Sequence, residues 1–181
     1  MVEDDTRSFS DERARLLHQL EVERNQLIRN IETVRIRDIE RPFVGEWSLK
    51  DIVGHINSWE SEVVSGFHDL QKEEPPELLH FNRERIHEWN QDHVENKRTI
   101  SFWSIYEQFQ AGRERLLRVI AAVSDEDLGT EGSIHNRLVH SVIDHERDHW
   151  HQIAARLAGM PGVREPSVSV PEDAASSGEG N

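Results

Sequence analysis

A pair of histidines late in the chain carries the clearest chemistry. His145 and His149 lie four residues apart. On a helix this spacing places both imidazoles on one face, about one turn apart, where both can bind a single metal ion. Two ligands do not complete a site, and His55, on a different predicted helix, is the candidate for the third. The pattern favours a three-histidine centre for a divalent transition metal ion.

Four long amphipathic segments must position these residues. Apolar residues recur at helical spacing in each of them, and a serine stands before each as a candidate N-cap. The segments cover residues 10–36, 48–70, 101–124 and 133–158. A shorter helix is expected over residues 81–97, in the connection between the second and third segments. This arrangement predicts an all-α fold, a four-helix bundle with one long crossover that carries a short extra helix.

The two ends of the chain differ from its middle. Residues 1–9 are expected to form a flexible N-terminus before the bundle, which would span residues 10–160. Residues 161–181 are rich in Pro, Ser, Gly and acidic residues, a composition that buries too little apolar surface to fold, and they are predicted to form a disordered acidic tail.

The helical period places the three histidines on inward faces. His145 and His149 share their face with apolar residues, and His55 lies one turn from Ile52 and from Trp59. By the same count His140 and His151 point away and are expected in solvent. A single inward histidine is more often a hydrogen-bonded core residue, and that interpretation stays open for each ring taken alone. A metal ion bound by neutral nitrogens explains all three buried rings together.

Composition excludes several functions. The 181 residues carry 21 basic and 35 acidic side chains, and a net charge of −14 opposes binding to nucleic acid or to an anionic membrane. There is no cysteine, so no disulfide and no thiol nucleophile, which fits a cytoplasmic location. The sequence contains neither a phosphate-binding glycine loop nor a G-x-S-x-G nucleophile elbow. The enzyme classes that depend on these motifs are therefore excluded, and the length fits a single domain.

Two motifs together resemble a known family. Trp47-Ser48-x-x-Asp51-x-x-x-His55, followed by His145-x-x-x-His149, is similar to the pattern of the DinB-like superfamily, and the resemblance covers residues 10–158. It implies a four-helix bundle with a divalent metal ion on three histidines, matched here by His55, His145 and His149. It also implies that dimers are common. Several subgroups of the superfamily transfer or isomerise groups with low-molecular-weight thiols such as mycothiol or bacillithiol.

Three neutral imidazoles would leave a coordination position open, as catalytic metal centres do. A metal ion there would lower the pKa of a bound water or thiol. Because the chain has no cysteine, the thiol would belong to a cosubstrate. The resemblance therefore leads us to expect a divalent-metal-dependent small-molecule enzyme, a transferase that uses a low-molecular-weight thiol, with Zn as the default metal and Ni or Fe as alternatives. A non-catalytic or protective binding protein of the same fold and a metal-dependent hydrolase are the alternatives.

Two carboxylates are candidates for catalytic roles. Asp51 lies one turn before His55 and could orient its ring, although it is equally suited to cap the helix. Glu62, seven residues after His55, could point into the same cavity, although a solvated acid at the surface is the simpler interpretation. Trp47 and Trp59 are expected to be packing residues.

The same part of the sequence also matches the motifs of two other kinds of metal site. His145-Glu146-x-x-His149 matches the H-E-x-x-H motif of zinc proteases, in which the glutamate is the general base. The chain lacks a convincing downstream third ligand and a strand that would hold a peptide. Glu84-x-x-His87 and Glu146-x-x-His149 match the E-x-x-H pattern of di-iron bundles, which also needs an inward glutamate on each of two further helices. We rank both below the three-histidine centre.

Overall fold

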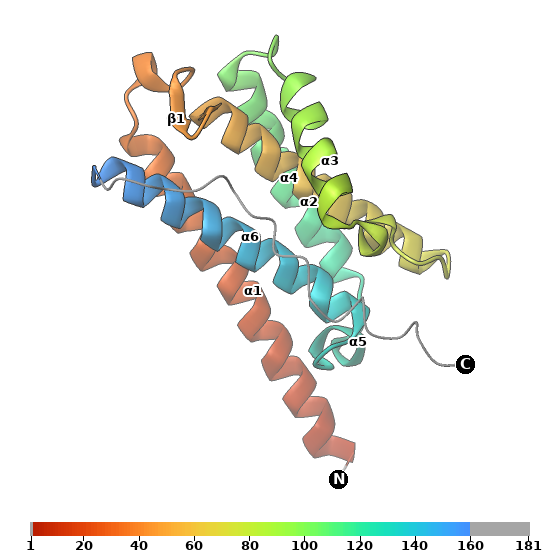
Figure 1. The fold of residues 1–181 in the computed structure, drawn as a ribbon. Coiled ribbons are helices and arrows are strands. Elements are labelled where there is room, and N and C mark those ends of the chain that lie inside the picture. Colours follow the sequence, from red (N-terminus) through yellow and green to blue (C-terminus); the bar gives the residue numbers. More distant parts are fainter. Residues whose placement is uncertain (1, 160–181) are drawn as a thin grey trace.

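The computed structural model describes residues 2–159, and the predicted tail at 161–181 lies outside them. Four long helices run side by side, confirming the predicted all-α fold (Figure 1). They are α1 (Val2–Thr33), α2 (Leu49–Gln71), α4 (Phe102–Ala121) and α6 (Ile134–Leu157). None of the helices in this part of the chain combines the length and the apolar character needed to cross a membrane.

Serine side chains begin three of these helices, as predicted. Ser48, Ser101 and Ser133 each accept a hydrogen bond from a backbone N–H of the first turn. At the other end of the last helix, Gly159 adopts a φ of +74°, the left-handed conformation that commonly follows a helix end. These local signals set the ends of the helices that carry the three histidines.

The first helix begins earlier than expected. We predicted a start at Ser10, whereas α1 begins at Val2 and includes residues 2–9. The sequence has neither proline nor glycine between Val2 and Ser10, so the backbone there can continue a helix in the N-terminal direction. A candidate N-cap is a permitted start and does not exclude an earlier one.

Two small features were not predicted. Strands β1 (Pro42–Val44) and β2 (Trp47–Ser48) form an antiparallel pair ahead of α2. Gly45, with a φ of +59°, makes the turn between them. A short helix, α5 (Asp125–Gly129), lies between the third and fourth predicted long helices, and Ser124 caps it. Strands this short show too few residues for an alternating pattern to be detectable in the sequence.

The crossover between α2 and α4 carries the short helix that was expected there. A 3₁₀ helix, η2 (Glu77–His80), leads there into α3 (Arg83–Glu95). Another 3₁₀ helix, η1 (Ile36–Asp38), lies outside the crossover, between α1 and β1. Helix α3 lies against α2 on the side away from α1 (Figure 1). This placement brings residues of the crossover close to the middle of α2.

A layer of buried polar residues divides the core. One apolar cluster includes Leu20, Val63 and Leu116, and the other includes Leu27, Ile56 and Phe109. Between them along the helices lies what we call the polar layer, to which each of the four long helices contributes. Its members are Glu23, Arg24, His55, Asn57, Ser58, Glu60, Arg113, His145, Glu146 and His149. Buried polar groups cost free energy unless they are paired or bind an ion, so this layer is where function is to be sought.

Candidate metal centre

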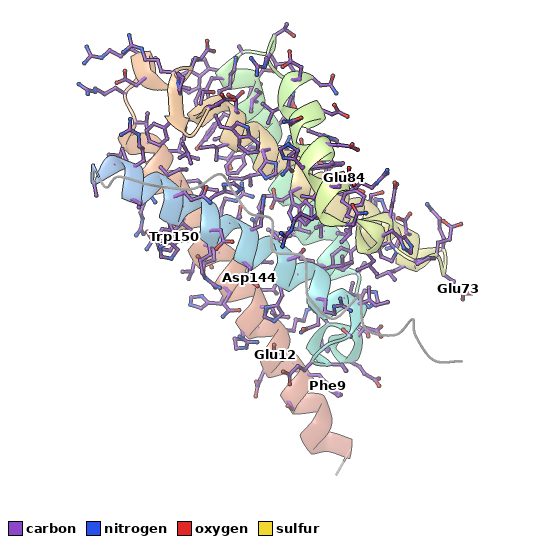
Figure 2. All side chains as sticks on the ribbon, viewed as in Figure 1. Phe9, Glu12, Glu73, Glu84, Asp144 and Trp150 are labelled. Atoms are coloured by element: carbon purple, nitrogen blue, oxygen red, sulfur yellow. The ribbon has the colours of Figure 1, made fainter. Side chains whose placement is uncertain are left out.

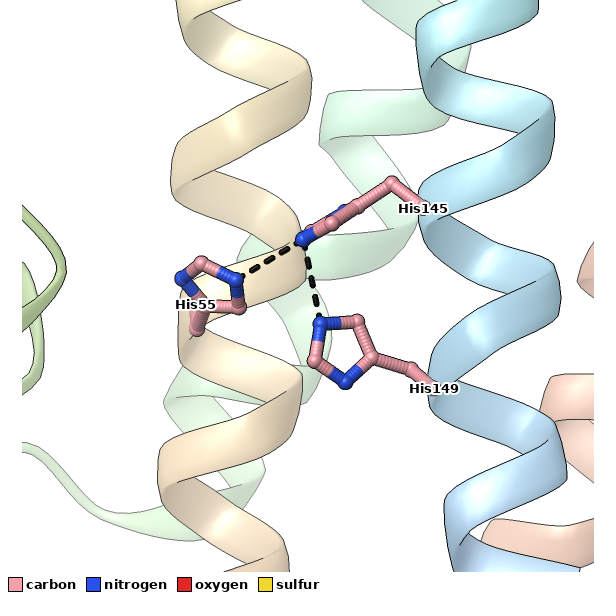
Figure 3. Close-up of side chains that lie close together, drawn as sticks. All are labelled: His55, His145 and His149. Atoms are coloured by element: carbon pink, nitrogen blue, oxygen red, sulfur yellow. Dashed lines mark hydrogen bonds between the residues drawn. The ribbon is translucent and has the colours of Figure 1, made fainter. Parts of the chain in front are cut away.

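The three predicted histidines meet inside the polar layer. His55 on α2 faces His145 and His149 on α6 (Figure 3). The Nε2 atom of His145 lies 2.8 Å from Nε2 of His55 and 3.0 Å from Nε2 of His149. All three rings are buried, with exposed fractions of 0%, 7% and 1% for His55, His145 and His149. The structure thus brings together the three rings that the helical period places on inward faces.

Burial keeps the three imidazoles neutral. It lowers the pKa of His55 and of His145 well below 6.5, and the neighbouring His149 adds to both effects. Burial also lowers the pKa of His149 to about 4, against a smaller opposing effect of Gln152. Neutral imidazole is the form that binds metal ions, so no proton has to be displaced near neutral pH.

The arrangement of these nitrogens fits a metal ion better than it fits hydrogen bonds. Both short contacts use the Nε2 atom of His145, which has either one proton or one lone pair to share. Nitrogen ligands of a tetrahedral zinc ion lie about 3.3 Å apart, so small rotations of the rings suffice to accept one. Within residues 2–159 these three residues are the only group whose ligand atoms converge in this way, all lying within 4.8 Å of one another.

The outward nitrogens of two rings have free hydrogen-bonding capacity. Nδ1 of His55 and Nδ1 of His149 are buried and make no hydrogen bond to any described residue. The buried Oε1 atom of Gln152, close to His149, is also without a hydrogen-bond partner. Metal-binding histidines usually donate the second ring N–H to an oxygen, and Gln152 is placed to accept that bond from His149 after a small adjustment.

Tryptophan rings surround the centre. Trp47, from β2, lies 5.0 Å from the His55 ring between ring centres, and Trp59 lies 5.4 Å from the His145 ring. Trp89 on α3 approaches His55 edge-on at 6.2 Å. Trp47 and Trp59 were predicted as packing residues, and each packs here against one of the three histidine rings. The contact of Trp89 was missed, because a helical period in the crossover cannot indicate which helix it will cover.

Asp51 acts as a helix cap in the structure. Its carboxylate accepts hydrogen bonds from the backbone N–H of Ser48 at 2.9 Å and from the Ser48 hydroxyl at 2.7 Å. Among the described residues nothing bonds to Nδ1 of His55, so the predicted contact between Asp51 and that ring is not made. Of the two roles weighed for Asp51, the structure contains the cap.

Asp51→Ala is expected to lower the free energy of unfolding by about 1 kcal/mol through the lost cap, and to leave the zinc affinity unchanged within twofold. Ser48→Ala removes the other half of the same cap and is the matched control. Zinc affinity would be measured by competition with a chromophoric chelator. A loss of tenfold or more in Asp51→Ala alone would show instead that this carboxylate orients His55.

Glu62 lies on the side of α2 that faces the crossover. Its side chain is half-buried, and burial raises its pKa, with Glu77 adding to the rise and His93 opposing it. It is not a member of the three-histidine group. A half-buried carboxyl with a raised pKa is suited to accept a proton. The catalytic role of Glu62 stays a prediction.

Four buried charges of the polar layer pair with one another, and the sequence did not reveal this pairing. Arg24 lies 2.7 Å from Glu60 and 2.7 Å from Glu146. Arg113 lies 2.8 Å from Glu60 and 2.5 Å from Glu146. The four residues come from α1, α2, α4 and α6, and we call this closed set of ion pairs the charge ring. Arg24 also lies over the ring of Phe109, 3.7 Å from its centre.

The structure argues against both alternative metal sites. Glu146 is fully buried and contacts both arginines, so it is not free to act as the general base of an H-E-x-x-H protease. Glu84 and His87 are exposed on α3, away from the polar layer; Figure 2 labels Glu84. The ligand set of a di-iron centre is therefore not assembled in the described part of the chain.

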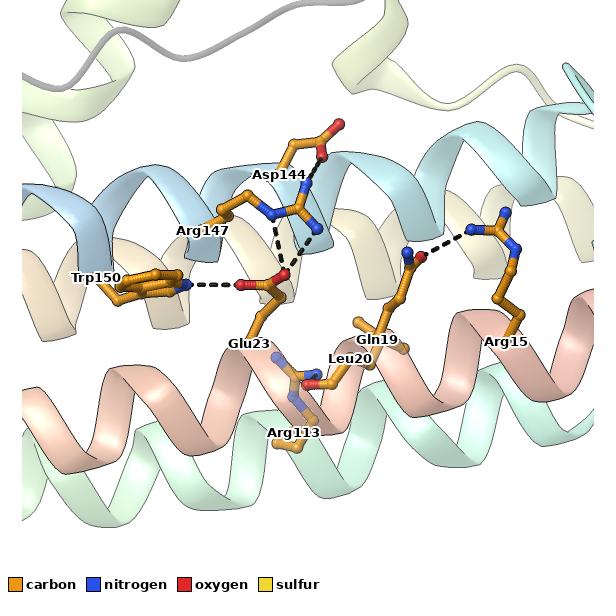
Figure 4. A network of polar contacts seen from close by, with 8 residues as sticks. All are labelled: Arg15, Gln19, Leu20, Glu23, Arg113, Asp144, Arg147 and Trp150. Carbon is orange, nitrogen blue, oxygen red and sulfur yellow. Dashed lines mark hydrogen bonds and ion pairs between the residues drawn. The ribbon is translucent and has the colours of Figure 1, made fainter.

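A second polar network joins α6 to α1. The buried carboxylate of Glu23 accepts hydrogen bonds from Arg147, at 2.7 and 2.9 Å, and from the indole N–H of Trp150 at 2.6 Å (Figure 4). Arg147 and Trp150 flank His149 in the sequence. These hydrogen bonds therefore hold the turn of α6 that carries His149 against α1. Of the two histidines expected in solvent, His151 is exposed and His140 is half-buried.

The chain belongs to the DinB superfamily, whose family model matches residues 39–153. A crystal structure of an uncharacterised protein from Escherichia coli UTI89 has the same fold, with a TM-score of 0.69 and 15% sequence identity. The match covers 82% of this chain and 95% of that one. A search of curated proteins gave no match. The superfamily binds metal ions in general, which agrees with the buried three-histidine group.

Proposed function

We propose that this protein is a metal-dependent transferase that uses a low-molecular-weight thiol. The observation that carries the proposal is the convergence of three neutral, buried Nε2 atoms at one point in the bundle. A divalent ion held there would supply Lewis-acid chemistry and make a thiol acidic enough to ionise near neutral pH. Zinc is the default metal, with nickel or iron as alternatives.

The residues of this chain would perform the other parts of the reaction. In a thiol transfer, sulfur forms a bond to an electrophilic carbon, the thiol proton goes to a base, and the leaving group departs. Because the chain has no cysteine, the sulfur comes from the cosubstrate. Glu62 is the candidate base, and the tryptophans around His55 would keep water from the reacting atoms. We also propose that the protein is cytoplasmic and that it forms a homodimer.

His145→Ala is expected to lower the zinc affinity at least about 100-fold, because the central ligand of the three is lost. His151→Ala, on the exposed side of the same helix, is the matched control and should change the affinity less than twofold. Elemental analysis of the reconstituted protein should find about one equivalent of metal. Less than a tenth of an equivalent of any transition metal would contradict the metal centre and favour the non-catalytic binding protein.

The reaction itself is tested by activity with thiols. The metal-loaded protein is combined with an electrophile such as 1-chloro-2,4-dinitrobenzene and with mycothiol, bacillithiol or a simpler thiol in turn. Thiol consumption that requires both the metal and His145 would support the proposal. Hydrolytic activity without any thiol would favour a metal-dependent hydrolase instead, and no reaction with every thiol would count against the transferase.

A further inference from the structure

Lys97, just after α3, attaches its ammonium group to the turn of α2 that carries His55. Its Nζ atom donates a hydrogen bond to the backbone carbonyl of Gly54 at 2.6 Å and another to the hydroxyl of Ser58. Gly54 directly precedes His55, and Ser58 follows it by three residues on the same helix. The positive charge therefore lies on the flank of the helical turn that carries the first metal ligand.

The site is shaped to receive this side chain. A Cβ atom built at Gly54 would lie 3.2 Å from the Cδ atom of Lys97, closer than most such contacts. Because Gly54 has no side chain, the aliphatic part of Lys97 can lie directly against α2. Its ammonium group can then reach the backbone carbonyl of Gly54. Lys97 is thus held at Gly54, the residue directly before His55.

No carboxylate neutralises Lys97 in the described part of the chain. Lys50 lies 3.4 Å from Glu40 and Lys72 lies 3.4 Å from Asp69, whereas Lys97 has no acid within 4.0 Å among residues 2–159. Burial lowers the pKa of Lys97 to about 8, so the ammonium form still predominates at pH 7. A half-buried cation without a counter-ion is unusual in a chain with a net charge of −14.

The neighbours of Lys97 along the chain complete a face suited to a small molecule. Trp89 and His93 are spaced by four residues, so they share one side of α3, and Lys97 lies in the turn that follows the helix. The ring of His93 stacks on that of Trp89 at 3.9 Å, and Trp89 in turn contacts His55. This face combines an aromatic surface, a half-buried histidine and an uncompensated ammonium group.

We propose that Lys97 binds the carboxylate of a small molecule that also reaches the three-histidine centre, so that the site selects an anionic thiol over a neutral one. This inference rests on the proposed function, because it takes the three histidines to hold a metal ion that binds sulfur. The metal ion would add positive charge to a site whose own ligands are neutral, which favours an anion further.

The test compares three simple thiols in the cobalt-substituted protein, in which sulfur binding produces a charge-transfer absorption. The probes are 3-mercaptopropionate, 2-mercaptoethanol and cysteamine, which carry a negative, a neutral and a positive end. The wild-type protein should bind 3-mercaptopropionate about tenfold more tightly than 2-mercaptoethanol, and cysteamine the most weakly. Lys97→Met should lose this preference, and Lys97→Arg should keep most of it.

Lys72→Met is the matched control, because it removes the same charge from an exposed position and should leave the preference intact. The cobalt ligand-field spectrum shows whether each variant still folds around its metal ion. Equal affinities for the three thiols in the wild-type protein, or a preference that survives Lys97→Met, would overturn the Lys97 site while leaving the metal centre standing. A protein that binds no cobalt would overturn the proposed function as well.

Discussion

Arg113→Met is expected to lower the free energy of unfolding by about 3–5 kcal/mol, the largest effect of any single substitution considered. Arg113 contacts both Glu60 and Glu146, which are 1% and 0% exposed. Its removal leaves two buried carboxylates with one remaining arginine, and the uncompensated charge has no access to water. Urea unfolding followed by circular dichroism measures the effect, with the exposed Arg118→Met on the same helix as the control.

A paired substitution tests whether charge balance is the cause. Arg113→Met combined with Glu60→Gln removes one charge of each sign and leaves the ion pair of Arg24 with Glu146. We expect the double variant to recover most of the lost stability, because a neutral, packed polar layer costs less than an unbalanced one. Additive losses in the double variant would show that packing rather than charge balance dominates at these positions.

Lowering the pH from 6.5 towards 4 is expected to destabilise the metal-free protein by at least about 3 kcal/mol. Burial lowers the pKa of His149 from 6.5 to about 4, and the pKa values of His55 and His145 fall in the same direction. Because the folded pKa lies below the unfolded one, the unfolded chain takes up protons first as the pH falls. Above pH 6.5 the three rings are neutral in both states and do not lower the free energy of unfolding. Below pH 6.5 they lower it progressively, because only the unfolded chain takes up the protons.

Urea unfolding between pH 7 and pH 5 in the presence of a chelator measures this decrease. His149→Gln removes one of the three titrating rings and should reduce the slope by about 1.4 kcal/mol per pH unit at its steepest. His151→Ala, exposed on the same helix, is the matched control and should change the free energy of unfolding at pH 7 by less than about 0.5 kcal/mol. Stability that stays constant from pH 6.5 to pH 5 in the metal-free protein would refute the interpretation of the three rings as neutral and buried.

The three histidines were predictable because their signal is local and repeats. A spacing of four residues on one helix and an apolar neighbourhood on another are properties of the helical period alone. The same holds for the caps at Ser48, Ser101 and Ser133, each of which the structure contains. For Asp51 the sequence permitted two roles, and the hydrogen bonds to Ser48 are those of the cap.

The charge ring was not predictable for the opposite reason. Arg24, Glu60 and Arg113 look like ordinary helix-surface charges in the sequence, and Glu146 fitted two catalytic motifs. Their pairing depends on the relative heights of four helices, which set which side chains meet in the polar layer. A helical period indicates the direction of a side chain and carries no information on what lies opposite it.

The amino-acid sequence by itself therefore determined the four long helices, most of their ends and the three imidazoles that point inward. The tertiary structure alone decided that the rings lie 2.8 and 3.0 Å apart, that Glu146 is held by two arginines, and that Lys97 reaches α2 from the crossover. The physical reason is the range of the interactions. Backbone hydrogen bonds and caps act within one turn of a helix, whereas ion pairs and ligand sets form between segments that only packing brings together.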